Sequence, residues 1–190
     1  QDEKEMSKRQ MVAAETQRGA IRLSQVNPES DPIDSVGGVS FRHLSMLAQI
    51  KSSDEDVWSS LNRSGHIKGD PSDSLMVRLA RMRNWIDGPH FPEDAKLEIR
   101  SEIGDDVRGE IGTTGINFLR NLEALLSECE WTDAGISESI SEACESTEVS
   151  RKQGFASIYW AIIGRRNGPK ASSLISEMDR DNILSLLGNA

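Results

Sequence analysis

The sequence predicts an all-α protein that folds as a compact multi-helix bundle with short connections. Apolar residues recur at helical spacing in several separate segments, and serine or aspartate residues stand before several of them, where a helix needs an N-cap. No sustained alternation of apolar and polar residues, which would indicate strands, occurs in the 190 residues. With 36% hydrophobic residues, the chain has enough apolar side chains to fill a helical core.

The predicted domain boundary lies close to two adjacent glycines. Residues 1–38 are sparse in apolar side chains and end in a stretch rich in proline and glycine, which is typical of a lead-in segment and a linker. We therefore expect one helical domain over residues 39–190, either as a single unit or as two subdomains over 39–112 and 113–190.

Three helices are predicted in the first half of this domain. The first follows Ser40 as its N-cap, and the second begins at Ser53 or Asp54. The third is expected to use Asp70 as its N-cap and Pro71 as its first residue. Their expected core-facing residues are Phe41, Leu44, Leu47, Ala48, Ile50, Val57, Trp58, Leu61, Leu75, Leu79, Met82 and Ile86.

The second half is predicted to begin with a link over residues 90–112, where charged residues interrupt the few apolar ones and no period is evident. A strongly amphipathic helix is expected after Gly115. Further helices are predicted from near Thr132, from Ser150 with Gln153 as a capping box, from Gly168–Pro169, and from Asp179. Their expected core residues include Ile116, Leu119, Leu122, Leu125, Leu126, Ile136, Ile140, Ala143, Cys144, Leu174, Ile175, Ile183, Leu186 and Leu187.

No constellation of catalytic, metal-binding or cofactor-binding residues stands out. Cys129 and Cys144 lack the close spacing of a zinc site and are predicted to be buried free thiols. The three histidines, His43, His66 and His90, lie on separate predicted elements without metal-ligand or triad spacing. We therefore expect no catalytic residue, metal or cofactor in this chain.

The formal net charge of -9 argues against a surface that attracts nucleic acid along its whole length, so RNA binding needs one local basic face. Arg78, Arg81 and Trp85 recur at i, i+3 and i+7 on the third predicted helix. Two guanidinium groups and an indole therefore share one face, on which single-stranded bases can stack. The alternative is that Trp85 is a core residue and the arginines are a solvated face.

A second basic group surrounds a predicted turn between two C-terminal helices. It consists of Arg165, Arg166 and Lys170, and backbone amides after Gly168 could add to the attraction for phosphate. The alternative is that these charges complement the dipole of the preceding helix. The predicted RNA-binding residues are therefore Arg78, Arg81, Trp85, Arg165, Arg166 and Lys170.

Three separated stretches carry a family resemblance. They are residues 39–50, residues 83–86 followed by 92–99, and residues 155–164 followed by Gly168–Pro169–Lys170. In this order they resemble the helical C-terminal region of class I lysyl-tRNA synthetases. The last stretch is similar to that family's terminal run of aromatic, Tyr, apolar residues, Gly and Gly-Pro-Arg. Lys170 replaces the arginine, which keeps the charge but loses the planar fork.

The resemblance implies an α-helix cage that meets the anticodon arm of tRNA(Lys), with an ATP-dependent, Rossmann-type catalytic domain elsewhere in the same polypeptide. The family's HIGH-like and KMSKS-like signatures do not occur in this chain. We therefore expect binding without catalysis here, and ATP in the catalytic domain. The charged opening residues 1–9 also predict a cytoplasmic chain without a signal peptide or membrane span.

Two alternatives stay open. The first is a helical docking module for another protein, whose binding would hardly vary with salt, whereas RNA binding would vary steeply. The second keeps the synthetase ancestry but assigns glutamate specificity, because glutamyl enzymes also end in a helical anticodon-binding region with Gly-Pro segments. The Phe-Arg-His-Leu stretch at residues 41–44 and the Asn84–Trp85 pair favour lysine.

Overall fold

The computed structural model describes residues 38–190, which lie in a single compact unit. The predictions for residues 1–37 lie outside the described residues. The elements in chain order are α2 (Phe41–Ile50), α3 (Asp54–Arg63), α4 (Asp73–Ile86), the 3-10 helix η1 (Glu93–Ala95), α5 (Asp105–Glu128), α6 (Asp133–Ser146), α7 (Arg151–Ile163), α8 (Ala171–Ser176) and α9 (Arg180–Gly188). Residues 38–190 contain no strand, so the predicted all-α class is confirmed.

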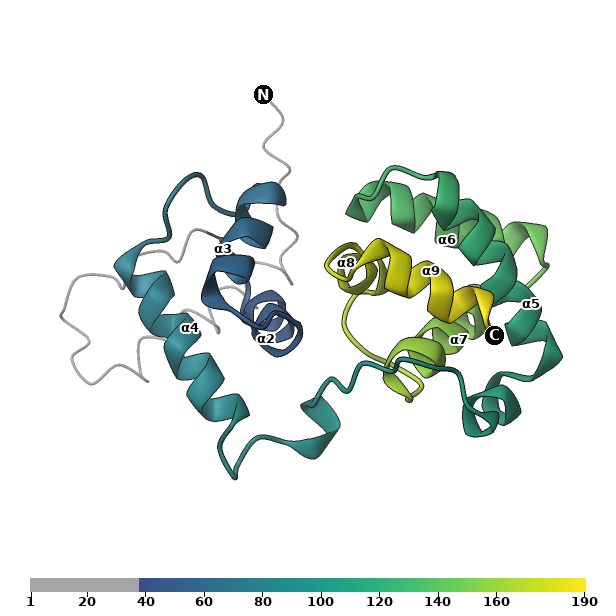
Figure 1. The fold of residues 1–190 in the computed structure, drawn as a ribbon, viewed down its shortest axis with the longest axis horizontal. Coiled ribbons are helices and arrows are strands. Elements are labelled where there is room, and N and C mark those ends of the chain that lie inside the picture. The colour runs from purple at the N-terminus through teal and green to yellow at the C-terminus, as the bar shows by residue number, and fades with distance from the viewer. Residues whose placement is uncertain (1–37) are drawn as a thin grey trace, which may run out of the picture. The chain divides into compact units, whose positions relative to one another are not determined.

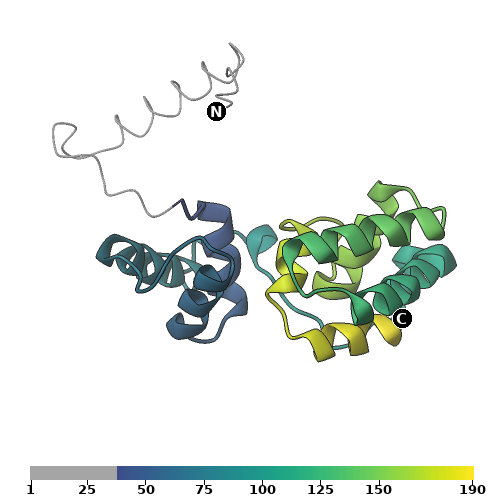
Figure 2. The same ribbon diagram turned by 90° about the horizontal axis from the view of Figure 1, so that it is seen from above.

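The helices form two sets that share one hydrophobic core. Helix α2 packs against α3 and α4, whereas α5 contacts α6, α7 and α9, and α8 rests on α6 (Figure 1). The connection over residues 87–104, which includes η1, joins the two sets, as Figure 2 also shows. Buried apolar side chains from both sets belong to one continuous cluster.

The N-caps show why most helices begin where the sequence predicts. In each of five cases a side-chain oxygen accepts a hydrogen bond from the backbone N–H three residues further along, which satisfies one of the unpaired donors at the helix start. The confirmed pairs of cap and donor are Ser40 with His43, Ser53 with Asp56, Thr132 with Gly135, Ser150 with Gln153, and Asp179 with Asn182.

The predicted start of α4 is wrong by two residues. Ser72, and not Asp70, is the N-cap, and its Oγ accepts from the backbone N–H of Leu75 at 3.3 Å. Both residue types are good caps, but only Ser72 stands three residues before Leu75, which begins the buried face of this helix. Pro71 therefore precedes the helix and is not its first residue.

The link predicted over residues 90–112 is also too long, because α5 already begins at Asp105. Its first seven residues are helical, with Val107 fully buried and two aspartates in the first turn. Gly112 then adopts φ 62° and ψ -177°, a conformation open mainly to glycine, and kinks the helix. The first part is short, with Gly109 inside it and Gly112 directly after it, which hides the helical period in the sequence.

The buried side of α5 is wider than predicted. Leu119, Leu122 and Leu126 are buried as expected, but Phe118, which the prediction omitted, is fully buried too. Phe118 and Leu119 are adjacent in sequence and cannot share one narrow stripe. Both are covered because α5 is contacted by α6, α7 and α9.

Several expected core residues are only partly covered. Phe41 is 55% exposed, and the others that lie at the edge of the core are Ile50, Trp58, Ile86, Ile116, Leu125 and Cys129. Cys144 is buried as a free thiol, as predicted.

Gly164 ends α7 in the left-handed conformation (φ 63°), which is typical of a glycine just after a helix. A Cβ at this position would stand against the guanidinium group of Arg100. The backbone N–H of Arg100 donates to the carbonyl oxygen of Ile162 at 2.8 Å, and its guanidinium pairs with Asp106 at 2.8 Å. The connection between the two sets of helices is therefore bonded to the end of α7.

Candidate nucleic-acid interface

A cleft of about 1230 Å³ is bordered by the first turn of α2, the ends of α3 and α4, the η1 segment, and the turn between α7 and α8. Aromatic and charged side chains from residues far apart in the sequence meet there. Its aromatic and charged lining residues are Phe41, Arg42, His43, Arg63, His66, Trp85, Phe91, Asp94, Trp131, Asp133, Arg165, Lys170 and Glu177.

Three side chains form an aromatic wall, consisting of Phe41, Trp85 and Phe91. The ring centroids of Phe41 and Trp85 are 5.8 Å apart at an interplanar angle of 49°, and Trp85 meets Phe91 edge to face at 4.7 Å. Phe91 is buried against Trp85, whereas Phe41 is 55% and Trp85 38% exposed. The wall therefore presents two accessible rings on a fixed base, as a stacking platform for bases requires.

Two histidines that the sequence placed on separate elements stack in this cleft. The rings of His43, on α2, and His66, just after α3, lie 4.6 Å apart and are nearly parallel at 20°. The Nδ1 atom of His66 is 2.7 Å from the Oγ of Ser64. Burial lowers the pKa of His43, and the neighbouring His66 lowers it further, while Glu177 and Asp133 act in the opposite direction.

The lowered pKa of His43 predicts a loss of stability in acid. Because folding favours the neutral ring, this contribution is fully present above the unfolded pKa of about 6.5 and is lost as the pH falls through the lowered folded value. We expect His43→Gln to reduce the decrease in the free energy of unfolding between pH 7.5 and pH 5, measured by urea denaturation. His90→Gln removes an exposed histidine outside the cleft and should leave that decrease unchanged. An equal decrease in all three proteins would contradict the assignment.

Four cationic side chains line the cleft, Arg42, Arg63, Arg165 and Lys170. Arg42 and Arg63 come from the aromatic side, on α2 and α3, and both are exposed. Arg165 donates from its guanidinium to the backbone carbonyl of Asp94, which holds the guanidinium beside η1. With three carboxylates in the same lining, these four cations leave a formal excess of one positive charge in the cleft of a chain that is acidic as a whole.

Lys170 is held by a carboxylate at the first residue of α6. Its Nζ lies 2.5 Å from Asp133 Oδ2, and the hydroxyls of Ser172 and Ser173 donate to Asp133 Oδ1 at 3.0 and 2.7 Å. Burial raises the pKa of Asp133, but the hydrogen bonds from Lys170, Ser173 and Ser172 outweigh it and hold the pKa below its ordinary value. A phosphate must therefore compete with Asp133 for Lys170.

The cleft brings together half of the six predicted RNA-binding residues. Trp85, Arg165 and Lys170 line it, whereas Arg78, Arg81 and Arg166 do not. Arg81 and Arg166 are exposed, and Arg78 is half-buried.

The predicted helix start at Gly168–Pro169 lies two residues too early, because α8 begins at Ala171 with Lys170 as its cap.

Arg83, which also stands in the basic part of α4, is engaged within the protein. Its Nε donates to Asp54 Oδ1 at 2.7 Å, and one terminal nitrogen donates to the carbonyl oxygens of Ala48 and Lys51 at 3.1 and 3.3 Å. This guanidinium satisfies the last carbonyls of α2 and binds the first turn of α3. Arg83 is therefore a structural residue at the junction of α2, α3 and α4.

Sequence reasoning missed Arg42, Arg63, Phe41 and Trp131 as cleft residues. Phe41 was assigned to the core because it fits the helical period, although it occupies the first helical position, where a side chain can turn away from the helix face. Trp131 packs against the guanidinium of Arg180, whose carbon lies 5.5 Å from the ring centroid. Only the packing of distant helices assigns these residues to one site.

Within residues 38–190, no group of three or more His, Cys, Asp or Glu side chains is arranged to hold a metal ion. None of the helices in this part of the chain is both long enough and apolar enough to span a membrane.

Comparisons with known proteins agree with this description. The model of the anticodon binding domain family matches residues 94–190. The lysine–tRNA ligase of Pyrococcus horikoshii is 26% identical over 176 residues, which cover 87% of this chain and 32% of that protein. The lysine–tRNA ligase of Methanopyrus kandleri is 28% identical over 204 residues, which cover 98% of this chain and 35% of that protein. The chain thus spans about a third of the length of these relatives.

The fold and cleft define an all-α domain whose cleft gathers aromatic and cationic side chains from distant helices. The chain belongs to the anticodon-binding domain family, whose model matches half of its length. Its predicted resemblance to the helical C-terminal region of class I lysyl-tRNA synthetases is confirmed.

Proposed function

We propose that this chain binds the anticodon arm of tRNA(Lys) and receives its unpaired bases in the cleft. The observation that carries the proposal is the aromatic wall, which shares one cleft with Arg42, Arg63, Arg165 and Lys170. Flat rings supply stacking to any base, and guanidinium or ammonium groups pair with the phosphates between bases. The lysine–tRNA ligases among the relatives favour tRNA(Lys) over the glutamate alternative.

In this proposal, tRNA binding and lysine activation belong to different domains of a longer polypeptide. The relatives are about three times as long as this chain, and their printed name is that of a ligase. We assign activation of lysine with ATP to a catalytic domain in that remaining length, and place the whole protein in the cytoplasm. This chain then holds tRNA(Lys) by its anticodon arm while the catalytic domain acts elsewhere on the same molecule.

Local charge decides whether RNA can bind an acidic chain. The cleft has four cationic and three carboxylate side chains in its lining. Two of the carboxylates, Asp133 and Glu177, are paired with Lys170 and Arg63, so these charges largely cancel and the attraction for a phosphate comes mainly from Arg42 and Arg165. The basic strip on α4 extends from Trp85 toward Arg81 and Arg78, one and two helical turns away, or about 6 and 10 Å. Phosphates next to a stacked base can follow this strip.

Filter binding of tRNA(Lys) tests the proposal. The wild-type chain should bind tRNA(Lys) more tightly than an anticodon-swapped tRNA, and affinity should fall steeply as salt rises. In the double variant Arg78→Ala, Arg81→Ala, we expect the slope of log affinity against log salt to become shallower by about 1.4, since each single-strand phosphate contact contributes about 0.7.

The double variant Arg151→Ala, Lys152→Ala is the matched control. It removes the same charge from exposed residues in the first turn of α7, outside the cleft. Its salt slope should stay close to that of the wild type. Equal slopes in all three proteins would remove the assignment of the α4 strip, and equal binding of both tRNAs by the wild type would remove the assignment to tRNA(Lys).

A further inference from the structure

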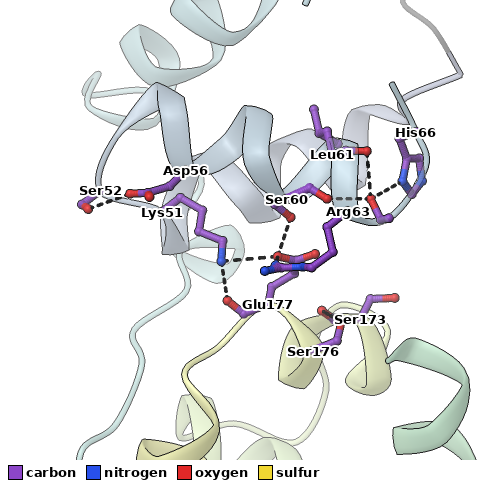
Figure 3. Close-up of polar contacts among 11 residues, drawn as sticks. Lys51, Ser52, Asp56, Ser60, Leu61, Arg63, His66, Ser173, Ser176 and Glu177 are labelled. Carbon is purple, nitrogen blue, oxygen red and sulfur yellow. Dashed lines mark hydrogen bonds and ion pairs between the residues drawn. The ribbon is translucent and has the colours of Figure 1, made fainter. Parts of the chain in front are cut away.

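Glu177 is a buried carboxylate immediately after α8 that binds three side chains of the other helix set. Its side chain is 5% exposed, and its Oε2 lies 3.3 Å from Lys51 Nζ and 3.1 Å from a guanidinium nitrogen of Arg63. The buried hydroxyl of Ser60 donates to the same oxygen. Lys51 Nζ also donates to the backbone carbonyl of Glu177 at 2.6 Å, so one ammonium group binds both the main chain and the side chain (Figure 3).

These contacts join helices that are far apart in the sequence. Lys51 follows α2, Ser60 and Arg63 lie on α3, and Glu177 follows α8. Within residues 38–190, every hydrogen bond or ion pair between the α2–α3 segment and the end of α8 involves Glu177. Other polar contacts between the two sets pass through the connection, for example from Arg165 to the carbonyl of Asp94.

A buried ion pair of this kind is better suited to fixing geometry than to adding stability. Removing two charges from water costs about as much as their attraction returns, so a well-packed apolar replacement is often as stable. Removing one partner alone is unfavourable, because a charge then stays buried without its counterion. Separation of the α2–α3 segment from the end of α8 would break the contacts of Lys51, Ser60 and Arg63 with Glu177 together, so these contacts hold the two parts at one spacing.

The same spacing determines the width of the cleft. Lys51 is the C-cap of the helix whose first residue is Phe41, and Glu177 is the C-cap of the helix that Lys170 precedes. Arg63 and Glu177 themselves line the cleft. On the basis of the proposed function, we propose that Glu177 is a positioning residue that sets the aromatic wall and the α7–α8 turn at the spacing required by one anticodon loop.

The substitution Glu177→Gln tests this role because it removes the charge and nearly preserves the shape. We expect binding of tRNA(Lys) to weaken about tenfold while binding of the anticodon-swapped tRNA hardly changes, so that discrimination between them is lost. The salt slope should not become shallower than that of the wild type, because no phosphate-binding cation is removed. Lys51→Arg keeps a cation beside Glu177 and should retain both affinity and discrimination within about twofold.

Glu93→Gln is the control for the change in charge. Glu93 is an exposed carboxylate whose Oε1 pairs with Lys96 at 2.6 Å, and it does not line the cleft. This variant should bind both tRNAs as the wild type does. Urea denaturation gives the unfolded fraction of Glu177→Gln. If this variant binds both tRNAs more weakly by the same factor, and that factor is explained by its unfolded fraction, the positioning role is overturned.

A distance measurement separates this inference from the proposed function. Nitroxide labels can be attached to Asn84→Cys on α4 and Glu138→Cys on α6, both exposed, after replacement of the native thiols by Cys129→Ser and Cys144→Ala. We expect Glu177→Gln, but not Glu93→Gln, to broaden the distance distribution, and an unchanged distribution overturns the inference. A wild-type chain that binds both tRNAs equally overturns the proposed function, whereas the label distances still decide whether Glu177 sets the spacing.

Discussion

Phe118→Ala is expected to lower the free energy of unfolding by about 3–5 kcal/mol, the range for removal of a large buried aromatic side chain. Phe118 is fully buried on α5, which contacts three other helices. It also lies close to Gly154 on α7, where an added Cβ would approach the Phe118 Cζ to 3.1 Å. Backbone this close to the ring cannot easily move inward to fill the cavity, which favours the upper part of the range.

Phe155→Ala is the matched control, because it removes the same side chain from a site that is 36% exposed on α7. Its cost should be well below that of Phe118→Ala, since less apolar surface is lost and solvent can fill the space. Urea denaturation followed by circular dichroism gives both values. Equal losses in the two variants would show that α5 is not the centre of the core.

The double variant Phe41→Ala, Trp85→Ala is expected to weaken binding of tRNA(Lys) by about 10–100-fold. Stacking of one base on an aromatic ring contributes about 1–3 kcal/mol, and 1.4 kcal/mol corresponds to a factor of ten. Both rings are partly exposed, so their removal leaves a smaller cavity than removal of a core residue. The variant should therefore fold, and its salt slope should match that of the wild type, because no charge is lost.

Phe155→Ala also serves as the control for this experiment, since Phe155 is exposed but lies outside the cleft. Filter binding at a fixed salt concentration should give the wild-type affinity for this control. If the double variant binds as tightly as the control, the aromatic wall does not receive bases, and the proposal must then rest on charge alone.

Local features of the sequence predicted most of the fold. Caps such as Ser40 and Asp179 act on backbone groups three residues away, so a short window of sequence contains both partners. The predicted helix starts are wrong where a short stretch of sequence offers two possible caps or contains glycines. Asp70 and Ser72 compete as caps for one helix, and the glycines before the kink at Gly112 obscure the start of another.

The site could be predicted only in part, because it depends on contacts between distant residues. The aromatic wall and Lys170 meet only once α2, α4 and the α7–α8 turn have packed. Glu177 received no role from the sequence, since its partner Lys51 is 126 residues away. Charge alone also misleads, because Arg83 looks free in the sequence but is bonded to Asp54 and to carbonyls of α2.

Because Gly164 has no side chain, Arg100 can pack against the end of α7 while it pairs with the first turn of α5. Any Cβ there would displace the guanidinium of Arg100, which pairs with Asp106 in the first turn of α5. A substitution of Gly164 by alanine is unfavourable for two reasons. The left-handed backbone at Gly164 disfavours any side chain, and the guanidinium of Arg100 occupies the space that the Cβ would need. A substitution at Gly164 would thus also disturb the ion pair between Arg100 and Asp106 at the beginning of α5.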